Sequence, residues 1–361
     1  MYCTDWFFQY TLWFIVQIII ARASQFSNFD WGTSVPITDI FSLPENGSFV
    51  DNIALLDDRT LLLTRIDAPE VWSVDLPTRS GRLVHSFAEN NNQLTSCFGI
   101  TKTGHHTFTV VVGQFDVAKF SPEKGSFGIW KVQLGLSINH DAPEERTRRH
   151  EAQFAGKNIA FSSQPVVSNF ANIFEASALG ASTLLETATS RFLLISDSLD
   201  GIIWKLDLET GEYDIALQDD SMLPPPDGPP MGVNGIKVHN GYLYYVSVGR
   251  KEFRRVRIDT AANAIGPFEL VSADITPDNF DIASDGTAYF ATNTENSIVS
   301  LTPEGEVIQI AGDKNSTRLA GPTCCALDPD GRTLYIGTNG GMMAPVGGVF
   351  EEPGKIAAIS V

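Results

Sequence analysis

One short motif, a residue that is polar or small in most copies and is followed two positions later by an apolar one, recurs six times along the chain. Its copies are Asp51–Ile53, Phe98–Ile100, Asn172–Phe174, Asn234–Ile236, Asp278–Phe280 and Cys325–Leu327. The first residues of the copies are two carboxylates, two carboxamides, one aromatic ring and one thiol. The carboxylate and carboxamide oxygens suit a hard cation such as Ca²⁺, and paired carboxylates can act as general acid and base. Asp and Asn are also frequent where a loop enters a strand, because their side chains satisfy local backbone groups.

A short β-rich run follows each copy of the motif, and a second run follows the first. The first runs include LLLT (61–64), FTVVV (108–112), YLYYVS (242–247) and TLYIGT (333–338). Turn signals separate the runs, among them Leu208–Gly211, Ser284–Gly286 and Asp328–Gly331. The two longest intervals between copies of the motif contain insertions, the charged stretch 137–158 and the proline-rich stretch 222–232. Short strands that otherwise repeat every 40 to 50 residues or so predict a propeller. We therefore expect an all-β, six-bladed β-propeller whose six motif residues form a ring at one mouth of the central channel.

The last repeat is one strand short, because the chain ends after KIAAISV (355–361). The segment ITDIFSL (37–43), which precedes the first repeat, can supply the missing outer strand. Such pairing closes the ring and removes an exposed sheet edge. The sequence thus predicts a single propeller domain over residues 24–361, closed by an N-terminal strand that completes the last blade.

The N-terminal residues 1–23 have the pattern of a secretory signal peptide. The apolar run 6–20 is short for a membrane span, and Ala21–Ala23 is a small-x-small cleavage pattern. A retained signal anchor is the alternative. We expect a secreted protein with no membrane span after cleavage, glycosylation at Asn46 and Asn315, and a disulfide from Cys97 to Cys324 or Cys325.

Bulk charge and missing motifs exclude several function classes. The formal net charge is −18, so the attraction to phosphate that dominates nucleic-acid binding would be reversed. The chain has no G-x-S-x-G elbow, H-E-x-x-H helix or Walker loop, and its histidines show no ligand spacing. Serine-hydrolase and zinc-enzyme interpretations therefore fail.

Loops on the ring's face of the propeller carry apolar side chains, including the proline-rich loop 222–232. Long loops on a rigid scaffold often hold the functional groups, and Phe and Met suit an apolar, adaptable ligand. These side chains could equally pack the loops onto the propeller. The expected substrate-pocket residues are Thr64, Arg65, Phe98, Phe115, Phe170, Phe280, Met231 and Met342.

The motifs FVDNIAL, GVNGIKV, PDNFDI and FANIFEA resemble those of the SMP-30/gluconolactonase/luciferin-regenerating propellers. That resemblance implies one divalent cation in the channel, held by Asp51, Asn234 and Asp278, with Asn172 beside them. In lactonases of the family, the residue that matches Asp278 is proposed as the general base. The first ligand of the family is usually Glu, and Asp51 is one methylene shorter.

A fungal branch of these propellers is more similar still. It shares recognisable forms of DNIALLDDRTLLLTRIDAPEVWSVD, ISDSLDGIIWKLDLETGEY and LAGPTCCALDPDGRTLYIGTNGG. Some members of that branch look like hetero-Diels–Alderases of tropolone sesquiterpenoid pathways, which join a tropolone o-quinone methide to a humulene-type olefin. The resemblance implies a small apolar or aromatic natural product as substrate.

Three functions are therefore weighed. The first is a cyclase that requires no cofactor, in which Asn172 and Asn234 bind tropolone oxygens and Asp51 or Asp278 assists loss of water. The second is a divalent-cation-dependent lactonase that uses Asp51, Asn234 and Asp278. The third is a secreted ligand-binding propeller without activity. The fungal resemblance and the apolar loops favour the cyclase.

Overall fold

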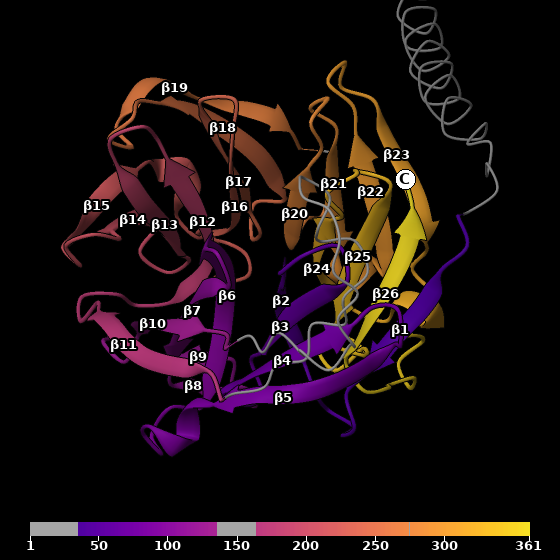
Figure 1. The fold of residues 1–361 in the computed structure, drawn as a ribbon. Helices are drawn as coiled ribbons and strands as arrows, with labels where there is room; N and C mark the ends of the chain where they lie inside the picture. The colour runs from indigo at the N-terminus through magenta and orange to yellow at the C-terminus, as the bar shows by residue number, and fades with distance from the viewer. Residues whose placement is uncertain (1–34, 136–163, 274) are drawn as a thin grey trace, which may run out of the picture. The chain divides into compact units, whose positions relative to one another are not determined.

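The computed structural model describes residues 35–135, 164–273 and 275–361. Strands β1 to β26 in these ranges form six four-stranded antiparallel sheets and one two-stranded hairpin. The sheets stand as blades around a common axis (Figure 1), which confirms the prediction of an all-β, six-bladed propeller. The predicted signal peptide 1–23 and the charged insertion 137–158 lie outside the described residues.

Each of the first three blades has four strands, written here from the channel outward. Blade 1 is β2 (Val50–Leu55), β3 (Thr60–Arg65), β4 (Glu70–Asp75) and β5 (Ser80–Ser86). Blade 2 is β6 (Ser96–Gly104), β7 (Thr107–Gly113), β10 (Gly128–Gln133) and β11 (Val166–Asn172). Blade 3 is β12 (Leu179–Glu186), β13 (Arg191–Asp197), β14 (Ile202–Asp207) and β15 (Tyr213–Gln218). The small hairpin of β8 (Phe115–Asp116) and β9 (Ser121–Pro122) projects from blade 2.

The other three blades follow the same plan. Blade 4 is β16 (Val233–His239), β17 (Tyr242–Ser247), β18 (Glu252–Ile258) and β19 (Ala264–Ser272). Blade 5 is β20 (Asn279–Ile282), β21 (Ala288–Thr292), β22 (Ser297–Leu301) and β23 (Val307–Gly312). Blade 6 is β24 (Pro322–Leu327), β25 (Thr333–Thr338), β26 (Lys355–Ser360) and β1 (Thr38–Ser42). Four 3₁₀ turns are described, at Phe87–Glu89, Asp220–Met222, Asn293–Glu295 and Thr317–Leu319.

The inner strands of neighbouring blades contact one another in the order β2, β6, β12, β16, β20, β24 and back to β2. In blade 6 the outer strand is β1, which runs antiparallel to β26 with Thr38 opposite Ala358. The ring of Phe41 also reaches blade 1, where its centroid lies 6.2 Å from that of Trp72. Strand β1 therefore contacts both blade 6 and blade 1.

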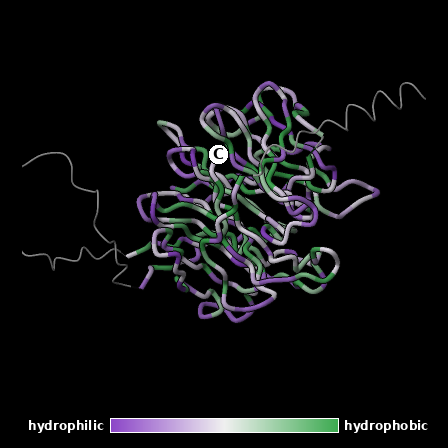
Figure 2. Tube along the Cα trace, turned by 90° about the vertical axis from the view of Figure 1, so that its right-hand side faces the viewer, coloured by the Kyte–Doolittle hydropathy of each residue, from purple (hydrophilic) through white to green (hydrophobic). Residues whose placement is uncertain are grey.

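Aspartates order the turns between strands, which is why the predicted turn signals coincide with real turns. The carboxylate of Asp328 accepts the backbone N–H groups of Arg332 and Thr333, and Gly331 adopts a φ of +67°. Asp207 accepts two N–H groups in the same way before Gly211, whose φ is +79°. Only glycine adopts such angles without steric cost. Figure 2 shows the outcome, with hydrophobic residues along the strands and hydrophilic residues in the turns.

The core consists of apolar clusters packed between neighbouring blades, such as the one between blades 3 and 4 around Ile203 and Tyr245. All three cysteines in the described residues are buried and free, so the predicted disulfide of Cys97 is wrong. Cys97 packs in the cluster of blades 1 and 2, whereas Cys324 packs in the cluster of blades 6 and 1. Neither Cys324 nor Cys325, the two predicted partners, is bonded to Cys97.

Within the described ranges, no helix has the length and apolar character needed to cross a membrane.

Candidate functional site

The pairing register of the inner strands defines one equivalent position in every blade. Each inner strand except β20 carries a register shift near its start, for example between Val50 and Ile53 in β2 and between Val233 and Ile236 in β16. In β20, the N–H of Asp278 bonds to the carbonyl of Ala291 one residue before the paired strand begins. The equivalent residues, called the channel ring below, are Asp51, Phe98, Gly180, Asn234, Asp278 and Thr323.

Hydroxyl groups tie the channel ring together between blades. Thr64 Oγ1 donates to the carbonyl of Phe98, across blades 1 and 2, at 2.6 Å. Thr323 Oγ1 donates to the carbonyl of Val50, across blades 6 and 1, also at 2.6 Å. These bonds hold blade 1 against blade 2 and blade 6 against blade 1, so ring residues from different blades keep their relative positions.

Asp278 accepts hydrogen bonds on both carboxylate oxygens. Asn234 Nδ2 donates to Oδ1 at 3.0 Å, and Asn293 Nδ2 donates to Oδ2 at 2.8 Å. Burial raises the pKa of Asp278 to about 7, aided by the negative charge of Asp51 and opposed by the two amide donors. Desolvation disfavours the charged form of a carboxyl group, and a like charge nearby adds to that effect.

Asp51 has a similar environment with fewer donors. Asn52 Nδ2 donates to its Oδ2 at 3.0 Å, and Asn279 Nδ2 donates to Oδ1 of Asn52 at 2.9 Å. Burial raises the pKa of Asp51 to about 6, against the effect of the Asn52 bond. The ring thus holds two carboxyl groups that titrate near neutral pH, and a pair with separated pKa values can divide the roles of acid and base.

An apolar cluster begins at the next ring position. The Phe98 ring packs on Phe115 and Phe127, with centroids 5.7 and 5.6 Å away. Met342, from the loop between β25 and β26, packs against the same cluster. Its other buried members from the neighbouring loops and strand ends are Phe49, Ile66, Ile173 and Ala176. The channel ring is therefore polar over blades 4, 5 and 1 and apolar at blade 2.

Several predicted residues lie elsewhere. Asn172 ends β11, the outer strand of blade 2, where it is exposed and accepts a hydrogen bond from Asn169. The ring position of blade 3 is Gly180 instead. Cys325 lies two residues beyond the ring residue of blade 6, and its Sγ donates to the carbonyl of Tyr289.

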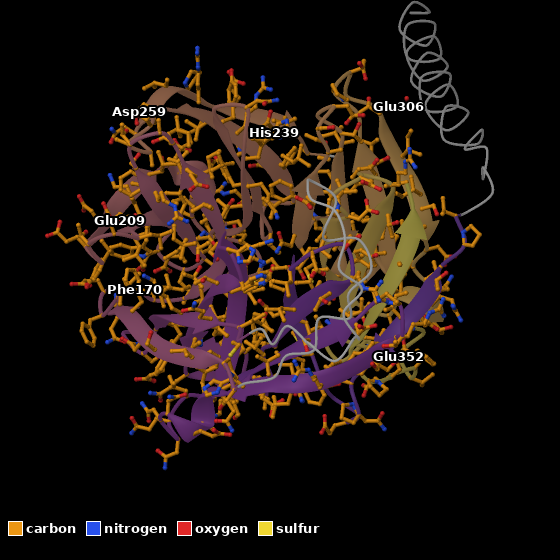
Figure 3. All side chains as sticks on the ribbon, in the orientation of Figure 1. Phe170, Glu209, His239, Asp259, Glu306 and Glu352 are labelled. Atoms are coloured by element: carbon orange, nitrogen blue, oxygen red, sulfur yellow. The ribbon has the colours of Figure 1, made fainter. Side chains whose placement is uncertain are left out.

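The predicted pocket residues divide in the same way. Phe280 is fully buried between Phe253 and Phe290 and belongs to the core, not to a pocket. Phe170 lies on outer strand β11 at the periphery (Figure 3), under the Nζ of Lys131 at 3.4 Å from its ring centroid.

Arg65 and Thr64 make contacts that hold the fold together. The Arg65 guanidinium pairs with Glu45, Asp67 and Glu70 at 3.3, 2.5 and 2.9 Å. Both side chains are buried.

The remaining predicted positions are compatible with their assigned roles. Met231 is partly buried at the end of the proline-rich loop, next to the strand that carries Asn234. Asn46 and Asn315 are both exposed, as glycosylation acceptors must be.

The oxygen atoms of the channel ring are not arranged to bind a cation. Asn234 turns its Nδ2 toward Asp278, so its oxygen, the only atom of the amide that can ligate a metal, lies on the Gly180 side. A Cβ added at Gly180 would stand 2.9 Å from that oxygen. No group of three His, Cys, Asp or Glu side chains converges on a common centre in the described ranges.

Four amides at this site were missed from the sequence: Asn52, Asn279, Asn293 and Asn339. A signal for them exists, because Asp-Asn occurs at Asp51 and Asp278, and Thr-Asn occurs at Thr292 and Thr338. Each dipeptide recurs at the same place in two blades. Gly180 left no signal, because a residue without a side chain offers no chemistry to recognise.

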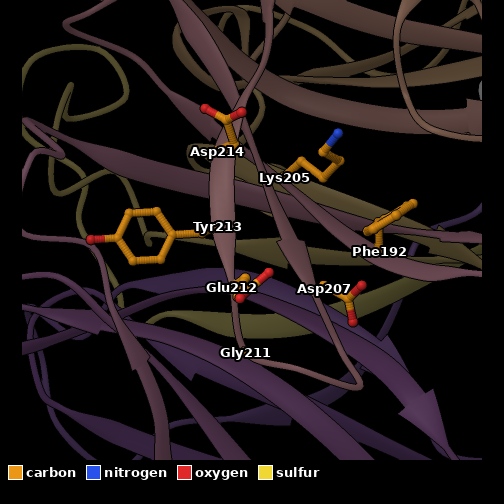
Figure 4. Close-up of a pocket in the computed structure, with 7 residues that line it drawn as sticks. All are labelled: Phe192, Lys205, Asp207, Gly211, Glu212, Tyr213 and Asp214. Atoms are coloured by element: carbon orange, nitrogen blue, oxygen red, sulfur yellow. The ribbon is translucent and has the colours of Figure 1, made fainter.

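A separate shallow pocket of about 510 Å³ lies on blade 3 (Figure 4). Its lining residues are Phe192, Lys205, Asp207, Gly211, Glu212, Tyr213 and Asp214, from β13 to β15. Lys205 Nζ already donates to the carbonyl of Ala261 at 3.0 Å. None of the channel ring residues lines this pocket.

No protein-family model matches the chain. Two curated fungal proteins are similar to it, and both are named "putative hetero-Diels-Alderase". The protein from Sarocladium schorii is 25% identical over 319 residues, which cover 81% of this chain and 75% of the relative. The protein from a Phoma species is 25% identical over 315 residues, which cover 81% and 84%. This similarity supports an enzyme of the cyclase type.

Solved structures confirm the fold. Luciferin-regenerating enzyme superposes with a TM-score of 0.58 at 10% identity, covering 91% of this chain and 95% of that protein. A protein of unknown function from Bacteroides thetaiotaomicron superposes with a TM-score of 0.60 at 13% identity, covering 90% and 75%. The predicted resemblance to these propellers and to the fungal relatives is thereby confirmed.

Proposed function

We propose that this protein is a cyclase that performs an intermolecular hetero-Diels–Alder reaction between a tropolone o-quinone methide and a humulene-type olefin. The observation that carries the proposal is the division of the channel ring. Titratable carboxyl groups and amides occupy one side, and the Phe98 cluster with Met342 begins on the other. A polar tropolone and an apolar olefin need such a divided site.

Asp278 and Asp51 are the residues we assign to formation of the quinone methide. Asp278, with the higher pKa, gives a proton to the hydroxyl of a hydroxymethyl tropolone, and the C–O bond breaks to release water. Asp51, with the lower pKa, accepts the proton of the ring hydroxyl. The two carboxyl groups end the step with the same total number of protons, so it needs no oxidant or reductant.

The cycloaddition itself needs no nucleophile. It forms one C–O and one C–C bond from the heterodiene and the olefin, and orientation of two partners can supply roughly 7–11 kcal/mol. Asn234 is the amide we assign to the tropolone oxygens, where a donor stabilises developing charge. Phe98, Phe115 and Met342 enclose the olefin.

The decisive experiment incubates the protein with the hydroxymethyl precursor and humulene. We expect faster product formation than without protein, and one stereoisomer in excess. Asp278→Asn should slow the reaction of the precursor, whereas Asp330→Asn in the exposed turn between β24 and β25 should not. A product ratio identical to that of the protein-free control would refute the cyclase.

A lactone hydrolase is the second candidate, because Asp51, Asn234 and Asp278, the residues that the family resemblance implies as ligands, do share the channel ring. This candidate requires the Asn234 amide to turn. It predicts that EDTA lowers the melting temperature and that added Ca²⁺ restores it. The cyclase proposal predicts the same melting temperature with and without EDTA.

A further inference from the structure

A chain of side-chain amides runs from the loop between β25 and β26 to Asp278. Asn339, the first residue after β25, donates from Nδ2 to Oδ1 of Asn293 at 3.1 Å. Asn293 donates in turn from Nδ2 to Asp278 at 2.8 Å. The two asparagines hold equivalent places in blades 6 and 5, each directly after the Thr that ends the second strand.

Asn339 is also the anchor of the loop itself. Its side chain is fully buried, and its Oδ1 accepts the N–H of Gly341 at 2.9 Å. Its backbone N–H donates to Gly321, and its carbonyl accepts the N–H of Met342 at 3.2 Å. One residue therefore fixes the start of the loop that carries Met342 and, through Asn293, one oxygen of Asp278.

The bonding partners of Asn339 and Asn293 fix the orientation of each side-chain amide. Oδ1 of Asn339 is committed to the Gly341 N–H, so only Nδ2 can face Asn293. Asn293 must then present Oδ1 to Asn339 and Nδ2 to Asp278. A buried amide network with every member satisfied has one arrangement, which is how such networks confer rigidity.

We propose that Asn293 and Asn339 are positioning residues that hold the carboxyl group of Asp278 in register with Met342, so that the polar and apolar halves of the site keep one separation. This inference rests on the proposed cyclase function. Neither asparagine needs to touch the substrate. Asn339 acts through Asn293, and Asn293 acts through Asp278.

The test is a set of variants in two backgrounds. Asn293→Ala removes the donor to Asp278 at a partly exposed position. Asn339→Asp keeps the acceptor for Gly341 but loses the donor to Asn293. We expect each to lower kcat for the hydroxymethyl precursor about 10- to 100-fold, with KM within about twofold, because misplacing a reacting group by about 1 Å has effects of that size. Asn263→Ala is the matched control, because it removes an amide–carboxylate hydrogen bond to Asp259 at an exposed turn, and it should leave both constants unchanged.

The Asp278→Asn background separates positioning from a structural role. If the asparagines act through the Asp278 carboxyl, neither substitution lowers kcat further in that background, because coupled residues are not additive. An equal decrease in kcat in both backgrounds would overturn the proposal. A change in KM with kcat unchanged would overturn it too.

A second readout needs no activity, so it distinguishes this inference from the proposed function. In NMR spectra of the free protein, Asp278→Ala should shift the side-chain amide signals of Asn293 and, to a smaller extent, of Asn339. The shifts should decline along the chain of bonds. Unmoved signals would refute the amide chain, whereas moved signals in a protein without cyclase activity would refute only the proposed function.

Discussion

The carboxyl groups of Asp51 and Asp278 set how activity responds to pH. Formation of the quinone methide needs Asp278 protonated and Asp51 ionised, and their pKa values are raised to about 7 and about 6. We expect the rate with the hydroxymethyl precursor to pass through a maximum between these values and to fall on both sides. The measurement is kcat/KM from pH 4.5 to 9.

A precursor that forms the quinone methide without acid provides the control. With that substrate the rate of cycloaddition should be flat over the same range, because no proton moves. A bell-shaped profile for both substrates would contradict the division of labour between the two steps.

The raised pKa of Asp278 also predicts a change in folding stability. The folded protein binds this proton more tightly than the unfolded chain, so the contribution to stability is present below about pH 4 and is lost as pH rises toward 7. Asp278→Asn removes this pH-dependent loss of folding stability, because an amide does not titrate. As the pH rises from 4 to 8, the unfolding free energy of the variant should increase by about 2 kcal/mol relative to that of wild type. This figure is reduced from the full pKa shift because Asp278 is only partly buried. Urea titrations at the two pH values measure it, and a constant difference would contradict the prediction.

Two adjacent methionines test the apolar half of the site. Met342 packs against the Phe98 cluster, whereas Met343 is 41% exposed. Met342→Ala should lower the stereochemical excess of the product and raise KM for humulene, because it removes part of the apolar surface that orients the olefin. Met343→Ala should leave both unchanged. Chiral chromatography of the products makes the comparison, and equal effects would refute the assigned role of Met342.

At the scale of single residues, side-chain chemistry decided what could be predicted. Asp51, Asn234 and Asp278 were recognisable because acids and amides at repeated positions are informative. Phe280 was misplaced because its motif position resembles a pocket residue, while the register directs its ring into the core. A shift of one residue in the pairing register moves each side chain of a strand to the opposite face of the sheet, and the sequence alone does not fix that register.

At the scale of elements, the number of blades could be predicted and one blade boundary could not. Strand β11 follows the insertion 137–158, so Asn172 was read as the start of blade 3 although it ends blade 2. The spacing that marks the start of other inner strands, a polar residue followed two positions later by an apolar one, also occurs at the end of this outer strand, at Asn172–Phe174. Only pairing with β10, where Gly128 faces Asn172, shows β11 to be an outer strand.

The N-terminal strand supports a prediction at the same scale. Besides its pairing with β26, Asp39 lies 3.4 Å from Nζ of the buried Lys355 and 3.3 Å from Arg318. Deleting residues 37–43 would leave the edge of β26 unpaired and remove Phe41 from its contact with Trp72. We expect that deletion to abolish cooperative unfolding, because an exposed edge and an open interface both favour aggregation or partial melting. Thermal melts followed by circular dichroism test this.

Deletion of residues 1–23 is the matched control and should not change the melting temperature. A cooperative melt at the original temperature after deletion of 37–43 would contradict the closing role of this strand. Asp39→Ala is a milder change to the same strand, and we expect it to lower the free energy of unfolding by about 1 kcal/mol.

At the scale of the whole molecule, three buried thiols report on three different interfaces between blades. Cys97 lies between blades 1 and 2, Cys324 between blades 6 and 1, and Cys325 faces Tyr289 of blade 5. Burial raises the pKa of Cys325 above its usual range and that of the other two well above it, so the native thiols should be inert. Because every blade contacts two neighbours, loss of one interface weakens the rest, and the ring should unfold as one unit. In a Cys3→Ser variant, the three thiols should therefore become reactive toward a thiol reagent at one common urea concentration. If Cys324 reacted at a lower urea concentration than Cys97 and Cys325, the ring would open first beside blade 6, and its blades would not form a single cooperative unit.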